Sequence, residues 1–184
     1  SYAAVGGKKE GEGPLAAGFD ELTADNLMGQ TSWEAAEAQL LLRAAKLCLK
    51  KAHATEKQVS LALSGDLQAQ CTASNYALRE LGVPFAGVFG ACSTMAETLG
   101  LGACLCSAGL ADGLLAMTSS HFCAAERQFR TPLSYGAVRT PTAQWTATAA
   151  GACLLRPAGE GIRVGAVTFG RVQDYQIKDI NNMG

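Results

Sequence analysis

The chain has few of the residues from which metal sites and disulfide frameworks are built. It contains two histidines in 184 residues, and its seven cysteines are an odd number with no Cys-x-x-Cys pair. Zinc sites draw on clustered Cys and His ligands, and disulfide frameworks use paired cysteines in secreted chains. We therefore expect no metal site and no disulfide framework. The simplest compartment for free thiols is a reducing cytoplasm.

The chain also lacks an excess of charge of either sign. Its 15 basic residues nearly balance 16 acidic ones, and 48% of the sequence is hydrophobic against 17% charged. This composition is typical of a folded globular protein. Binding to nucleic acid is driven by a basic surplus, so the sequence predicts no nucleic-acid partner.

No hydrophobic run has the length of a membrane span. The best candidate, residues 98–111, is an uncharged stretch of 14 residues between Glu97 and Asp112, whereas a spanning helix needs roughly 20 apolar residues. We interpret it as a buried helix and expect no transmembrane segment. The chain opens inside an apparent strand without an initiator Met, and its last residues form no closing element, so we expect a piece of a longer protein.

Helical and strand-like patterns alternate along most of the chain. Thr31 and Glu34 have capping-box spacing, and apolar residues then recur every three or four positions, which predicts a helix ending near His53. The other predicted segments are strands at 1–5, 59–64, 84–89 and 114–118 and helices at 72–81 and 94–107. This alternation predicts an α/β fold with a mostly parallel sheet and helices on both faces. Two strand-like runs, 146–155 and 162–169, flank a Gly-rich turn and predict a hairpin that adds antiparallel strands.

Three of the predicted strands end in residues whose side chains can bind a ligand or take part in catalysis. In an open α/β sheet, ligands bind beyond the carboxyl ends of the parallel strands. The residues at these ends are Gly65 and Asp66, then Gly90, Ala91 and Cys92, then Ser119, Ser120 and His121. The sequence therefore predicts an acid, a thiol and an imidazole at one edge of the sheet.

Cys92 is the most informative of these residues. Gly90 permits a tight turn after the strand, and Ser93 or Thr94 can cap the helix that follows. Backbone N–H groups and the dipole at a helix N-terminus favour a thiolate, a bound carboxylate or an oxyanion. The turn alone leaves two interpretations of Cys92, a functional thiol and a small core residue.

The remaining candidates also have two interpretations each. Asp66 is either a ligand contact or a structural residue, that is, a helix cap or a solvated turn residue. His121 is either functional or a hydrogen-bonded structural residue. The arginines of residues 126–130 either pair with an anionic ligand or lie on an exposed face. Gln144 lies at the end of the long polar segment 122–144, and loops of this length are often functional.

Six sequence blocks, spread over nearly the whole chain, are shared with one known family. They are residues 6–15, 83–94, 118–121, 125–130, 141–146 and 178–184. Through these blocks the chain resembles the stage V sporulation protein AD family, which belongs to the thiolase-like superfamily. The resemblance implies that residues 1–184 form the N-terminal half of a thiolase-like fold, the second half being absent.

The resemblance also implies a function. Members of the family bind dipicolinic acid (pyridine-2,6-dicarboxylate) and, as SpoVA proteins, take part in its uptake into the developing spore. The implied ligand is dipicolinate, alone or as its calcium chelate, with no other cofactor. Candidate ligand contacts in this sequence are Cys92, Gly90, Ser93, Asp66, Ser120, His121 and Gln144. The implied partners are other SpoVA membrane proteins and a second copy of the chain, at the cytoplasmic side of the spore inner membrane as a peripheral protein.

The superfamily also supplies an alternative function. Its ketoacyl synthase III enzymes carry an acylated cysteine at the position of Cys92, so the alternative is a cysteine-dependent acyltransferase acting on a coenzyme A or acyl-carrier thioester. These enzymes complete catalysis with residues from the second half of the fold, so His121 does not correspond to their catalytic histidine. The resemblance favours ligand binding over catalysis.

Overall fold

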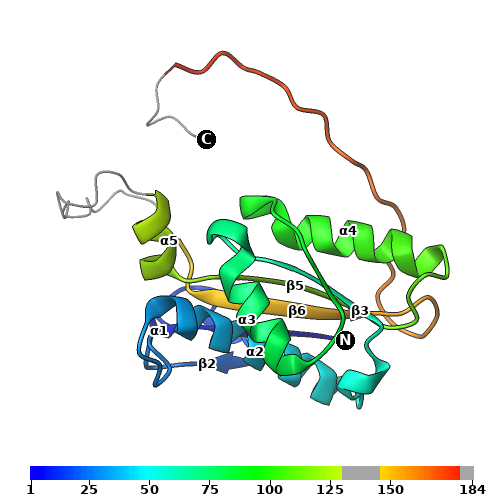
Figure 1. Ribbon diagram of the computed structural model, residues 1–184, viewed down its shortest axis with the longest axis horizontal. Helices are drawn as coiled ribbons and strands as arrows, with labels where there is room; N and C mark the ends of the chain where they lie inside the picture. The colour runs from blue at the N-terminus through cyan, green and yellow to red at the C-terminus, as the bar shows by residue number, and fades with distance from the viewer. Residues whose placement is uncertain (130–145, 179–184) are drawn as a thin grey trace.

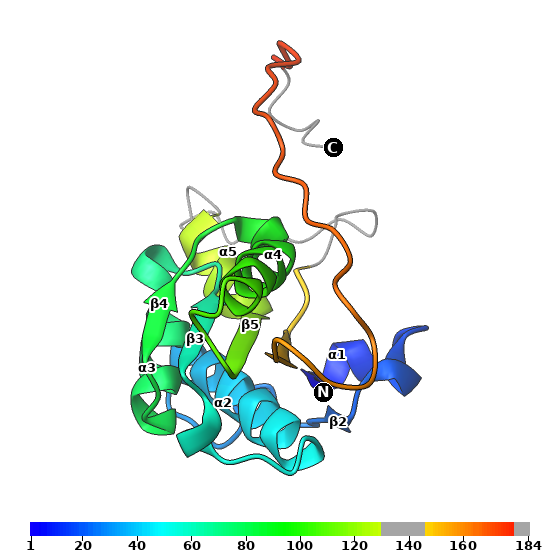
Figure 2. The same ribbon diagram turned by 90° about the vertical axis from the view of Figure 1, so that its right-hand side faces the viewer.

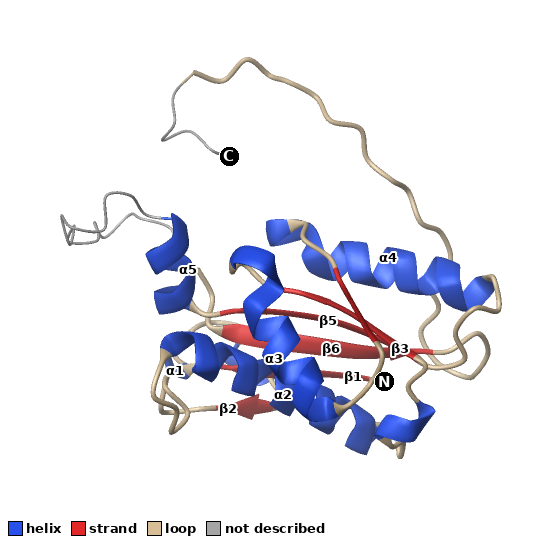
Figure 3. Cartoon of the chain, in the orientation of Figure 1, coloured by secondary structure: helices blue, strands red, loops and turns tan. Residues whose placement is uncertain are grey.

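A mixed sheet of six strands forms the centre of the protein, for which a computed structural model describes residues 1–129 and 146–178. The strands are β1 (Tyr2–Gly6), β2 (Glu21–Leu22), β3 (Leu61–Gly65), β4 (Phe85–Gly87), β5 (Leu114–Ser120) and β6 (Ala149–Leu155). They lie in the order β2-β1-β6-β5-β3-β4. Only β6 runs antiparallel to its neighbours, while the other pairs are parallel. Figure 3 shows the strands in red between the blue helices. The predicted α/β fold, with a mostly parallel sheet and an antiparallel strand, is confirmed.

Helices cover both faces of this sheet (Figures 1 and 2). They are α1 (Lys8–Gly11), α2 (Trp33–Lys51), α3 (Thr72–Leu81), α4 (Thr94–Ser107) and α5 (Phe122–Phe129), with short 3-10 turns at Ala16–Gly18, Glu56–Gln58, Ala69–Cys71 and Ala91–Ser93. Helices α2 and α3 pack on one face around the larger hydrophobic core, and α4 packs on the other face around a smaller one.

The side chains of β5 show how the two faces are divided. Leu115 and Met117 belong to the core under α2 and α3, whereas Leu114 and Ala116 belong to the core under α4. Successive residues of a strand point to opposite faces. The alternation therefore directs the side chain of Ser119, two residues beyond Met117, toward α2.

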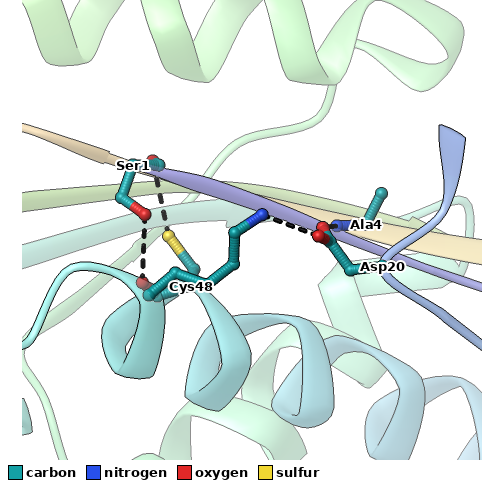
Figure 4. Close-up of polar contacts among 5 residues, drawn as sticks. Ser1, Ala4, Asp20 and Cys48 are labelled. Carbon is teal, nitrogen blue, oxygen red and sulfur yellow. Dashed lines mark hydrogen bonds and ion pairs between the residues drawn. The ribbon is translucent and has the colours of Figure 1, made fainter. Parts of the chain in front are cut away.

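Helix α2 is fixed at both ends. The hydroxyl of Ser32 accepts a 3.1 Å hydrogen bond from the N–H of Ala35, so Ser32 is the N-cap and the predicted capping residue, Thr31, is one position too early. At the other end Lys51 contacts Asp20 at 2.6 Å. The Asp20 carboxylate also accepts the N–H of Ala4 in β1 at 2.9 Å (Figure 4). These contacts join the last turn of α2 to β1 and to the segment that enters β2.

The predicted hairpin of residues 146–155 and 162–169 is wrong in its second strand. Residues 162–169 form no strand, and Ile162 is 96% exposed. The reason is that β6 already has a neighbour on each side, since it pairs with β1 and with β5. The chain after β6 instead extends away from the sheet (orange to red in Figure 1).

The uncharged stretch 98–111 forms most of α4, whose buried residues include Thr98, Gly100 and Cys106. This helix has 14 residues. Across the described ranges, no helix combines the length and apolar character required to cross a membrane.

Candidate functional site

Cys92 lies in a tightly bonded turn between β4 and α4. The carbonyl of Gly90 accepts hydrogen bonds from the N–H and the hydroxyl of Ser93, at 2.9 and 2.7 Å. The hydroxyl of Thr94 donates to the carbonyl of Ala91 at 2.9 Å and accepts the N–H of Gly90 at 3.2 Å. These bonds fix the turn on both sides of Cys92 and leave its side chain exposed.

The backbone of this turn has two special positions. Ala91, immediately before Cys92, has a φ of 47°, a left-handed backbone conformation that residues other than glycine rarely adopt. At Gly90, an added Cβ would lie 2.5 Å from a carboxylate oxygen of Glu97 and 2.6 Å from the hydroxyl of Ser93, so a larger residue would require these two side chains to move. Strained residues of this kind cluster at functional sites.

A cavity of about 550 Å³ opens beside Cys92. We call it the Cys92 cavity. Its wall includes Leu67 from the loop after β3, Thr118 and Ser120 at the end of β5, and Gly151 of β6. The hydroxyl of Ser120 donates to the carbonyl of Ala147 at 2.6 Å, which ties the end of β5 to the segment that enters β6. The structure therefore brings two of the predicted site residues, Cys92 and Ser120, to one cavity.

Asp66 lies at the same edge of the sheet but on its other face. It is 1% exposed, and its carboxylate accepts hydrogen bonds from the N–H of Gln68 (2.9 Å) and from the N–H and hydroxyl of Ser74 (2.8 and 2.7 Å). These three bonds hold the start of α3 against the end of β3. The Asp66 side chain is thus occupied within the fold.

His121 is also buried, and both of its ring nitrogens are engaged. Its Nδ1 accepts the N–H of Cys123 at 3.2 Å, and its Nε2 lies 2.9 Å from the carbonyl of Asn26. These partners fit a neutral ring with its hydrogen on Nε2. Burial lowers the pKa of His121, which favours the same form. Its ring packs beside that of Trp33, with centroids 5.3 Å apart. The predicted contact Gln144 lies outside the described residues.

Glu37 is a buried carboxylate that the sequence analysis missed. It is fully buried on α2 and accepts hydrogen bonds from Gln68 Nε2 (2.7 Å) and from the hydroxyl of Ser119 (3.0 Å). Burial, the main cause, raises the pKa of Glu37 to about 7. The signal in the sequence was its spacing, because Glu37 lies four residues after Trp33 and three before Leu40, on the apolar face of the helix.

Glu37 belongs to a connected set of buried polar side chains. We call this set the Glu37 network, which consists of Glu37, Ser64, Asp66, Gln68, Ser74 and Ser119. All six residues are less than 5% exposed. The network joins α2, α3 and the ends of β3 and β5, and thereby holds the edge of the sheet that carries the Cys92 cavity.

The Cys92 cavity has the chemistry of an anion site without basic side chains. Its described wall carries a thiol and hydroxyl groups and no charged residue, and it lies at the N-terminal end of α4. Backbone N–H groups and the helix dipole favour an anion at such an end. Elsewhere among the described residues, no three His, Cys, Asp or Glu side chains are grouped to hold a metal ion.

The fold is that of thiolase-like enzymes. The chain superimposes on 3-oxoacyl-(acyl-carrier-protein) synthase III from Aquifex aeolicus VF5 with a TM-score of 0.52 and 18% identity, over 67% of this chain and 39% of that one. It superimposes on a type III pentaketide synthase from Neurospora crassa with a TM-score of 0.53 and 16% identity, over 76% and 42%. At these identities the likeness shows the fold alone. The chain is thus an α/β protein of the thiolase-like class, with a cysteine at its strand-to-helix turn.

Sequence comparison narrows this class to one family. Residues 1–184 match the model of the stage V sporulation protein AD (SpoVAD) family. The chain is 40% identical over its full length to stage V sporulation protein AD of Bacillus subtilis (strain 168), of which it spans 54%. The chain belongs to the stage V sporulation protein AD family, a family of sporulation proteins, and the resemblance predicted from its sequence blocks is confirmed.

Proposed function

We propose that this protein binds dipicolinate in the Cys92 cavity and takes part in the uptake of dipicolinate into the developing spore. Membership of a sporulation family supports the biological setting. The observation that carries the binding proposal is the cavity beside Cys92, which adjoins the N-terminal end of a 14-residue helix. An aromatic dicarboxylate is matched by helix N–H groups for one carboxylate and by hydroxyl groups for the other.

The proposed contacts fall into two groups. Cys92, Gly90 and Ser93 form the turn at the start of α4, and Ser120 lies across the cavity at the end of β5. We assign Asp66 and His121 to the support of this wall, because their side chains are bonded within the fold. Gln144 remains a proposed contact from the segment between α5 and β6. The ligand binds either as the free dianion or as its calcium chelate.

Calorimetry with two isomeric ligands tests this proposal. Pyridine-2,6-dicarboxylate and pyridine-3,5-dicarboxylate carry the same charge, but only the first places both carboxylates beside the ring nitrogen. The expected result is binding of the 2,6 isomer and at least tenfold weaker binding of the 3,5 isomer. Repeating the titration with calcium distinguishes the free ligand from the chelate. Equal affinity for both isomers would reject a site shaped for dipicolinate.

We further propose that the protein acts at the cytoplasmic side of the spore inner membrane, with other SpoVA membrane proteins and a second copy of itself as partners. The family name and the expected membrane transport of an anion support this arrangement. Fractionation of sporulating cells tests it. The protein should sediment with the inner membrane and be released when those membrane proteins are deleted, and an unchanged distribution in the deletion strain would count against it.

The alternative, a cysteine-dependent acyltransferase, is less well supported. The two synthases compared above share 18% and 16% identity with the chain, which is too low to infer the same activity for it. Within the described wall of the Cys92 cavity there is no histidine to activate the thiol. Incubation with acetyl-coenzyme A followed by mass spectrometry decides between the two, because an acyl group on Cys92 is expected only of an acyltransferase.

A further inference from the structure

The end of β5 joins the Cys92 cavity to the Glu37 network. Thr118, Ser119 and Ser120 line the cavity. Ser119 also donates a 3.0 Å hydrogen bond to Glu37. A change at Glu37 therefore reaches the cavity wall directly through Ser119.

The loop after β3 repeats this arrangement. Leu67 lines the cavity, whereas Gln68, the next residue, donates a 2.7 Å hydrogen bond to the Glu37 carboxylate. Asp66, two residues before Gln68, accepts the N–H of Gln68 at 2.9 Å, and this bond fixes the position of Gln68 in the loop. The Glu37 side chain is thus bonded both to the loop after β3 and to the end of β5.

Glu37 is placed to hold a proton. Among the described residues, the buried Gln68 Oε1 has no hydrogen-bond partner, and it belongs to the amide that contacts Glu37. In this orientation the amide presents its Nε2 to Glu37, so a neutral Glu37 would donate to Oε1 once the amide is turned over, whereas an ionised Glu37 could not donate in either orientation. Burial is the main cause that favours the neutral form, and it outweighs the hydrogen bonds from Gln68 and Ser119, which lower the pKa of Glu37. Repulsion from Asp66 and Glu34 adds to the effect of burial.

The other elements around α2 bring no compensating cation toward Glu37 in the described part of the chain. Strands β1, β5 and β6 contain no charged residue, and neither do residues 122–125 of α5. Helix α3 carries Arg79 and Glu80, which line an outer groove together with Glu34. Glu80 pairs there with Lys46 at 3.6 Å.

We propose that Glu37 couples anion binding in the Cys92 cavity to the uptake of one proton, the neutral form of Glu37 being the form that binds the anion. This inference rests on the proposed function of the cavity. An ionised Glu37 places a negative charge behind the wall that receives the ligand, and a buried charge is poorly screened. The proton comes from solvent and stays on the Glu37 carboxyl while the anion is bound. Binding of the anion together with this proton therefore adds one negative charge fewer to the protein than binding of the anion alone.

Calorimetry of the wild-type protein with dipicolinate at pH 6, 7 and 8 tests the coupling. With the pKa of Glu37 at about 7, affinity should be about tenfold weaker at pH 8 than at pH 6. Titrations at pH 7 in buffers of different ionisation enthalpy should report uptake of about half a proton per ligand, because the free carboxyl is then half ionised. Binding without proton uptake would overturn the inference.

Two variants test whether the proton taken up on binding resides on Glu37. Glu37→Gln keeps an amide donor and acceptor beside Gln68, so it should bind with the wild-type pH 6 affinity at all three pH values. Glu80→Gln removes the same charge from an exposed ion pair and should keep the wild-type pH dependence. A Glu37→Gln protein that retains the pH dependence would overturn the inference and leave dipicolinate binding intact. Absence of wild-type binding at every pH would instead reject the proposed function, and the coupling with it. If Glu37→Gln does not fold, the number of protons that the wild-type protein takes up per bound ligand decides whether the coupling exists.

Discussion

The hydroxyl of Ser119 at the end of β5 donates a 3.0 Å hydrogen bond to the carboxylate of Glu37 on α2, across 82 residues of sequence. Ser119 lines the Cys92 cavity together with its two neighbours, and Glu37 is fully buried. A buried carboxylate with this position has consequences for stability that do not depend on any ligand.

The first prediction concerns the pH dependence of folding. The pKa of Glu37 is about 7 in the folded protein against an ordinary value of 4.5. The folded state therefore keeps a proton that the unfolded chain releases, and stability falls as pH rises from 4.5 to 7, by about 3 kcal/mol. Urea unfolding of wild type and Glu37→Gln at pH 5, 6 and 7 measures this. The free energy of unfolding of Glu37→Gln should fall less steeply with pH than that of wild type, because the contribution of Glu37 is absent. Equal pH dependence in the two proteins would contradict the prediction.

The second prediction concerns the start of α2. Because Ser32 accepts the N–H of Ala35, Ser32→Ala should lower the free energy of unfolding by about 1 kcal/mol. Thr31→Ala, one residue earlier, is the matched control and should change it by less than about 0.5 kcal/mol. Equal losses in the two variants would show that the cap is not at Ser32.

The third prediction concerns the close approach of β3 to the segment before Cys92. A Cβ on Gly65 would lie 2.0 Å from the backbone oxygen of Val88, whereas a Cβ on Gly151 would meet nothing within 4 Å. Gly65→Ala should therefore destabilise the protein by about 3 kcal/mol through overpacking. Gly151→Ala, also in the sheet, should lie within about 0.5 kcal/mol of wild type by thermal unfolding. A wild-type melting temperature for Gly65→Ala would be incompatible with this packing.

The elements that the sequence predicted well are those with local signals. Helices α3 and α4 have the predicted bounds, 72–81 and 94–107. Gly82, with a φ of 73°, ends the first of them in the left-handed conformation that glycine favours. The partners of β6 carry no local signal, because β1 lies about 150 residues earlier in the chain. The hairpin prediction failed for this reason.

The candidate site was predictable to the level of strand ends and no further. Parallel strands place Asp66, Cys92 and Ser120 at one edge of the sheet, as the alternation of elements indicates. Which face each side chain takes depends on single-residue steps of the backbone, which turn Asp66 toward Ser74 and leave Ser120 beside the cavity. Glu37 comes from an element remote from these ends, so its role depends on tertiary packing.

The most direct test of the account is dipicolinate calorimetry on two cysteine variants. Cys92 and Cys104 are both exposed thiols, one in the turn before α4 and one within that helix. Cys104→Ala should bind dipicolinate with wild-type affinity, and Cys92→Ala should bind it at least tenfold more weakly while remaining folded by circular dichroism. Wild-type affinity in Cys92→Ala, or equal losses in the two variants, would contradict a ligand site at the Cys92 turn.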